Sequence, residues 1–90
     1  MTITTRSAQT HSRFFRCVGI SDNDGRVVRH APAILTRDGW GDWKGVLHYE
    51  LVGYLGQEMV IWTPEGQSRC LVEETTRGQT LLVGTGPAPF

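Results

Sequence analysis

His48 and Glu50 come closest to a catalytic pair in this chain, an imidazole and a carboxylate two positions apart. Residues at this spacing share one face of a β-strand, so the two groups could act as a general acid and a general base. The same alternation puts polar pairs on any strand that faces water, and this favours a solvated strand face. A small oligomeric enzyme with a site between subunits is therefore only the second alternative function.

Other catalytic and metal-binding patterns are missing from the sequence. His11, His30 and His48 are scattered, and no cysteine or carboxylate lies at a metal-ligand spacing from them. The acidic run at residues 22–25 lacks the ligand pattern and the closing glutamate of a calcium loop. No nucleophile motif appears, and the glycines in residues 84–86 precede no helix that could hold a phosphate. We expect no metal, no cofactor and a function other than catalysis.

Cys17 and Cys70 are the two cysteines, and each lies in a short apolar run. The first residues lack the apolar core of a signal peptide, which indicates a cytoplasmic protein whose cysteines are reduced and buried. No apolar run approaches the roughly eighteen residues of a membrane span, so we expect no membrane partner.

Trp40 and Trp43 lie in a glycine-punctuated segment, residues 39–45, with Asp42 between them. An indole offers a flat apolar face and one hydrogen-bond donor, which suits stacking on a ligand or a partner side chain. Two interpretations stay open at this point. The pair forms a contact surface together with Tyr54, or it plugs one end of the fold.

A second candidate contact surface is basic and belongs to the first predicted hairpin. Its members are Arg13, Arg16, Arg26 and Arg29. Guanidinium groups bind phosphate or carboxylate groups in bidentate fashion. Nine basic residues balance nine acidic residues in the whole chain, so no overall charge attracts nucleic acid. We expect a protein partner first; a nucleic-acid-binding barrel is the alternative, and it needs these arginines on one face.

Local patterns predict strands throughout the chain. The Asp, Asn and Gly of residues 21–25 predict a hairpin turn between strands at residues 14–20 and 26–30. The alternating run at residues 46–55 predicts one long strand. Its core face would carry Leu47, Tyr49, Leu51 and Leu55. Shorter strands are expected at residues 34–36, 58–63, 67–75 and 79–83. Trp62 is expected to lie in the core.

The connections are too short for crossover helices, so the sheet must be mostly antiparallel. We expect an all-β fold, a bent sheet or barrel of five or six strands with the size of SH3-like or OB-like domains. Residues 1–12 would be a flexible arm, residues 13–84 the single β domain, and residues 85–90 an extended tail that leaves the fold.

The small size of the chain bears on its function. A chain of 90 residues buries only about 60 to 65 per cent of its unfolded surface, so self-association would add useful burial. We therefore predict a small non-enzymatic binding or assembly module. It would contact a protein partner, a second copy of itself included, through the tryptophan loop and the arginine-bearing hairpin.

Overall fold

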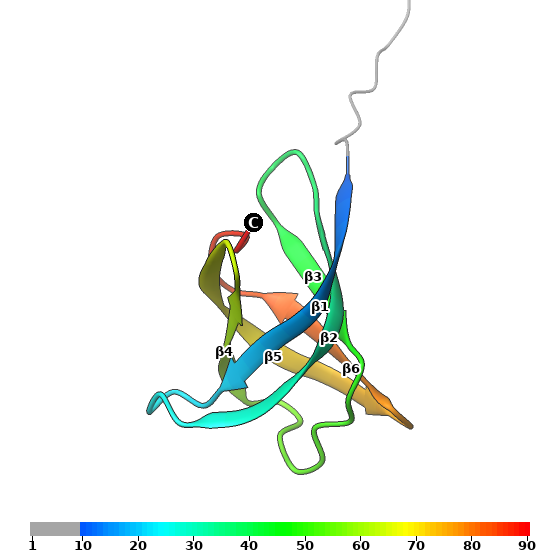
Figure 1. Cartoon of the computed structure of the whole chain (residues 1–90), viewed down its shortest axis with the longest axis vertical. Coiled ribbons are helices and arrows are strands. Elements are labelled where there is room, and N and C mark those ends of the chain that lie inside the picture. Colours follow the sequence, from blue (N-terminus) through cyan, green and yellow to red (C-terminus); the bar gives the residue numbers. More distant parts are fainter. Residues whose placement is uncertain (1–9) are drawn as a thin grey trace, which may run out of the picture.

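The computed structural model describes residues 10–90, which form six β-strands and no helix. The strands are β1 (His11–Ser21), β2 (Val27–Arg37), β3 (Trp43–Leu47), β4 (Glu58–Thr63), β5 (Gly66–Thr76) and β6 (Gln79–Gly84). They close into a barrel in the order β1-β2-β3-β6-β5-β4, and every neighbouring pair is antiparallel (Figure 1). The predicted small all-β barrel is confirmed.

The strand order follows the Greek-key rule. β1, β2 and β3 are neighbours in sequence and in space, and β4 then returns to pair with β1 on its other side. The return connection spans residues 48–57. β5 and β6 complete a meander that brings β6 beside β3 and closes the barrel.

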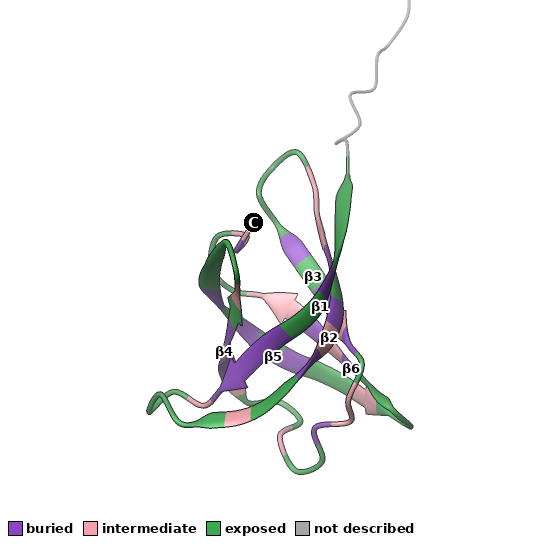
Figure 2. Cartoon of the chain, viewed as in Figure 1, coloured by how far each residue is buried: buried purple, intermediate pink, exposed green. Residues whose placement is uncertain are grey.

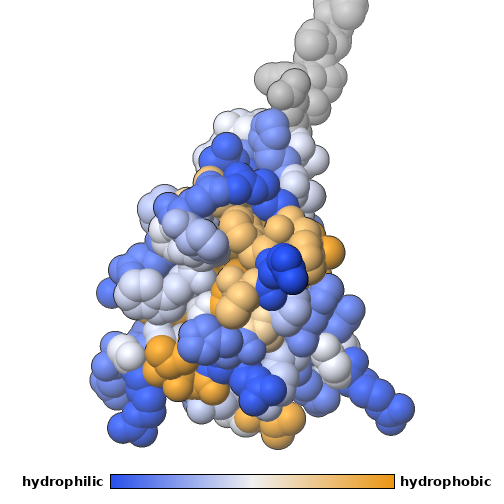
Figure 3. Space-filling view, viewed as in Figure 1, coloured by the Kyte–Doolittle hydropathy of each residue, from blue (hydrophilic) through white to orange (hydrophobic). Residues whose placement is uncertain are grey.

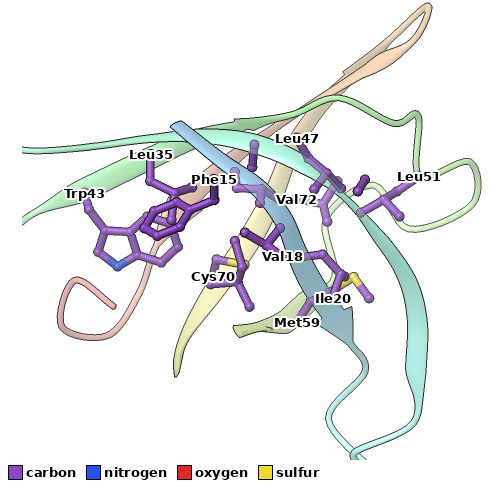
Figure 4. Close-up of a cluster of buried hydrophobic side chains, with 14 residues drawn as sticks. Phe15, Val18, Ile20, Leu35, Trp43, Leu47, Leu51, Met59, Cys70 and Val72 are labelled. Atoms are coloured by element: carbon purple, nitrogen blue, oxygen red, sulfur yellow. The ribbon is translucent and has the colours of Figure 1, made fainter. Parts of the chain in front are cut away.

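Side chains that alternate along the strands fill the barrel interior. Fourteen buried apolar residues form one cluster (Figures 2 and 4). In Figure 4, Trp43 lies at one end of this cluster beside Phe15 and Leu35, and Leu51 lies at the other end. Because the cluster runs from end to end, the barrel interior is a packed core.

The β1–β2 hairpin turn has the predicted chemistry. The Asp22 carboxylate accepts hydrogen bonds from the backbone N–H groups of Asp24 and Arg26, at 2.9 and 2.8 Å. Gly25 has a φ of 84°, a conformation that other residues adopt only at a cost. This turn sets the register of the two longest neighbouring strands.

The long strand predicted at residues 46–55 is wrong, because β3 ends at Leu47 and the chain then bends through residues 48–57. Two glycines in this connection, Gly53 and Gly56, have positive φ. Leu51 is buried as expected, but it reaches the core from the connection: its N–H donates to Thr80 Oγ1 at 2.9 Å. Leu55 was expected in the core and is 63% exposed.

Two further burial predictions are wrong. Trp62 is 46% exposed, because it points outward from β4 while its neighbour Ile61 points into the core. Cys17 is exposed, whereas Cys70 is buried as predicted. The register of β1 against β2 shifts between Phe15 and Val18, and this bulge moves Cys17 to the outer face.

The tail does not leave the fold as predicted; residues 85–90 turn back over one end of the barrel. Thr63 Oγ1 donates to the backbone oxygen of Pro89 at 2.9 Å, and the Arg37 guanidinium donates to that of Phe90. The Phe90 ring packs against the core with an edge toward Phe15, at a centroid distance of 6.0 Å. The tail therefore covers the barrel end that Trp43 fills.

Most of the predicted N-terminal arm, residues 1–9, lies outside the described residues. His11 and Ser12, which the prediction placed in the arm, begin β1. Within residues 10–90 there is no helix with the length and apolar character needed to cross a membrane.

Candidate interaction site

Residues 38–42 connect β2 to β3, and we call them the Trp40 loop. The Asp38 carboxylate accepts hydrogen bonds from the N–H groups of Trp40 and Asp42, at 2.8 and 3.1 Å. The backbone adds two more bonds, from Asp38 N to the oxygen of Asp42 at 2.9 Å and from Gly41 N to that of Asp38 at 3.3 Å. These bonds hold the loop in one shape while the Trp40 side chain is 72% exposed.

Trp43, three residues later, is in a different environment. It is only 4% exposed and its indole Nε1 donates to the backbone oxygen of Gly86 at 3.0 Å. A Cβ atom at Gly84 would overlap the indole, so the absence of a side chain there makes room for Trp43. Trp43 therefore plugs one end of the barrel. Trp40 is exposed, as the contact-surface interpretation requires.

A hollow of about 510 Å³ lies beside the Trp40 loop. Its charged lining comes from Arg37, Asp38, Asp42 and Lys44. Asp42 is exposed at its rim. Two cations and two carboxylates give this hollow no strong charge of one sign, which suits a polar protein surface better than a polyanion.

Arg13 takes part in covering the barrel end. Its guanidinium forms an ion pair with Glu65 and lies over the rings of Phe15 and Phe90, at 5.3 and 5.9 Å from the centroids. Arg37 stacks on Phe90 as well, at 5.2 Å. Arg13 therefore has an intramolecular role that the sequence did not reveal, because Glu65 and Phe90 are about fifty and more than seventy positions away.

The other predicted arginines lie elsewhere. Arg29 stacks on the ring of Tyr49 at 4.2 Å. Arg29 pairs with Ile20 on β1, and Ile20 is seven residues from Arg13, or about 23 Å along the strand. Arg16 and Arg26 are exposed. Tyr54 lies in the 48–57 connection, half-buried against the core. Arg13 and Arg29 therefore do not lie together in a single copy, whereas the nucleic-acid alternative needs all four arginines on one face.

A third feature was missed by the sequence interpretation, an apolar hollow on the outer face of β1. It has a volume of about 450 Å³, and we call it the Trp62 groove. Its lining residues are Cys17, Gly19, Val27, His30, Trp62 and Pro64. Figure 3 shows an apolar area beside the β1–β2 turn, at the lower left, with hydrophilic atoms around it.

The register of three strands builds this groove. Gly19 on β1 pairs with His30 on β2 and with Trp62 on β4, so the residue without a side chain lies between an imidazole and an indole. The indole is fixed by a bond from its Nε1 to Ser21 Oγ at 3.1 Å. The signal in the sequence was the alternation of Ile61 and Trp62, which predicts opposite faces for the two side chains.

The strand that was expected to align His48 with Glu50 ends before them. His48 and Glu50 follow the end of β3 and share no strand face. The ring of His48 lies 6.4 Å from that of Phe14, while Glu50 accepts a long hydrogen bond from Gly78 N at 3.5 Å. Among residues 10–90 no group of three or more metal-ligating side chains comes together.

No family model, curated protein or solved structure shows a significant match to this chain. The function must therefore be inferred from the surface of the barrel itself.

Proposed function

We propose that this chain is a small non-enzymatic binding or assembly module that contacts a protein partner through the Trp40 loop. The observation that carries the proposal is the 72% exposure of Trp40 on a loop whose backbone is held by Asp38. A large aromatic ring that is exposed to water can bury apolar surface when a partner covers it. Tryptophan is also enriched among the residues that dominate binding energies.

The loop geometry supports this role. A flexible loop loses conformational entropy when a partner binds, and this loss weakens binding. The hydrogen bonds of Asp38 and Gly41 have already ordered the Trp40 loop before any contact is made. The arginine-bearing hairpin offers a second contact surface, with the exposed Arg16 and Arg26 suited to carboxylate groups on a protein.

The test compares proteins retained by immobilised wild-type chain, by Trp40→Ala and by a control variant, Val52→Ala. Val52 is also largely exposed, at 74%, but it lies in the 48–57 connection. We expect a protein from the source cells, the chain's own copies included, to bind the wild type and Val52→Ala alike. Binding to Trp40→Ala should be weaker by about tenfold or more. Equal retention by all three baits would contradict the proposal.

A further inference from the structure

Two features of this barrel are a projection and a hollow, and they cannot meet within one copy. The Trp40 loop is a rigid projection with an exposed indole, and the Trp62 groove is an apolar hollow. His30, in the groove, and Arg37, where the loop begins, are seven residues apart on β2. That is about 23 Å of extended strand, so Trp40 cannot reach the groove of its own chain.

The groove has the right form to receive a flat aromatic side chain. Gly19 adds no side chain between His30 and Trp62, and the indole of Trp62 forms one wall that its bond to Ser21 holds in place. Val27 and Pro64 add apolar surface. An indole that enters this space would meet Trp62 in the stacked or edge-to-face contacts that aromatic pairs favour.

The charges around the two features also match. The Trp40 loop carries the carboxylates of Asp38 and Asp42, and the cations Arg37 and Lys44 flank it. Asp38 accepts hydrogen bonds within the loop, so Asp42 is the carboxylate left for a partner. Arg16 and Arg26 are exposed and adjacent in sequence to the groove residues Cys17 and Val27. Among residues 10–90 the one ion pair joins Arg13 to Glu65, so Asp42 and these two arginines have no ionic partner there. The Asp42 carboxylate would therefore approach a groove that has Arg16 and Arg26 beside it.

We infer that the Trp40 loop of one copy inserts into the Trp62 groove of a second copy, so that the chain associates head to tail. This inference rests on the proposed function and names the partner as another copy of the chain. Because the loop and the groove are different surfaces, the contact is heterologous, and repetition of it produces a closed ring or an open filament. It also brings together, between copies, the tryptophan loop and the arginine hairpin that one barrel keeps apart.

The experiment uses two variants that each remove one side of the contact. Trp40→Ala removes the projecting indole, and Val27→Asp places a carboxylate in the groove at a side chain that is 52% exposed. Each variant alone should be monomeric in sedimentation velocity over a concentration series in which the wild type forms larger species. A mixture of the two should form a one-to-one dimer, because Val27→Asp keeps its loop and Trp40→Ala keeps its groove.

The controls separate a lost contact from a lost fold. Val52→Asp, which places the same charge outside both features, should assemble like the wild type, and all variants should melt close to it. Gly19→Ala is a second groove variant: its Cβ would lie 3.5 Å from the His30 ring and 3.8 Å from Trp62 Cβ, so it adds a methyl group between these two side chains without a clash. It should weaken assembly in the same direction as Val27→Asp.

Either of two results would overturn the head-to-tail contact. The first is a monomeric wild type. The second is that the two single variants are monomeric and their mixture is monomeric as well. The second result would instead fit a symmetric interface in which each copy needs both features. If the immobilised wild type still retains a different protein and Trp40→Ala does not, the proposed function is supported in either case. If no protein is retained in a Trp40-dependent way, the head-to-tail contact and the proposed function are both overturned.

Discussion

Trp40 and Trp43 are chemically identical and three residues apart, but one lies in water and the other in the barrel core. The difference arises at the end of the barrel. Trp43 starts β3 and points inward, where the tail and Gly84 close around its indole, whereas the bonds of Asp38 turn the Trp40 loop away. One tryptophan therefore contributes to stability and the other is left for contact.

The largest expected effect tests this contrast directly. Trp43→Ala should lower the free energy of unfolding by about 3 to 5 kcal/mol, because it leaves a large cavity and removes the bond to Gly86. Trp40→Ala should change it by no more than about 0.5 kcal/mol, as expected for an exposed side chain. Urea denaturation of both variants measures the two values. Equal losses would mean that the exposed indole also stabilises the fold, and would remove the distinction between the two residues.

Leu51 and Leu55 extend the comparison to the 48–57 connection. Leu51 is buried and its N–H bonds to Thr80, while Leu55 is exposed. Leu51→Ala should cost about 2 to 5 kcal/mol of stability. Leu55→Ala should cost less than about 0.5 kcal/mol. The midpoints of urea denaturation measure both losses, provided that the dependence of the unfolding free energy on urea concentration is unchanged. A Leu55 variant as unstable as the Leu51 variant would instead support the long strand that the alternation predicted.

The features that depend on neighbours in sequence were predictable. Asp22 and Gly25 define the first hairpin by local hydrogen bonds and backbone conformation, and short glycine turns define the meander of β4 to β6. Leu51 was correctly placed in the core for a reason that does not hold. Its burial depends on Thr80, a residue of a distant strand, rather than on an alternating run.

The site depends on contacts that sequence patterns do not contain. Cys17 faces outward because β1 bulges against β2, and Gly19 lies between His30 and Trp62 only when the barrel closes β1 onto β4. The position of Phe90 over the barrel end likewise depends on Arg13 and Arg37, which lie far from it in sequence. The tryptophan loop is therefore predictable from the sequence, and the groove is not.

The cysteines give the third and smallest contrast between inside and outside. Burial raises the pKa of the Cys70 thiol from 9.0 to about 12, and the nearby Glu58 carboxylate adds to the rise. The unfolded chain loses this proton above about pH 9 while the folded chain keeps it, so this group lowers stability as pH rises from 9 toward 12. Cys70→Ala removes that contribution, and its stability penalty should therefore shrink between about pH 7 and about pH 10.

The measurement is urea denaturation of wild type, Cys70→Ala and Cys17→Ala at both pH values, with a reductant present. Cys17 is exposed, so its variant should follow the wild type at each pH. A thiol reagent gives an independent check, since in the folded protein it should react with Cys17 and leave Cys70 unmodified. A penalty for Cys70→Ala that stays constant with pH would mean that the folded and unfolded chains ionise this thiol alike. Cys70 would then be as accessible to water as Cys17, and the contrast between the interior and the outer face would fail at this position.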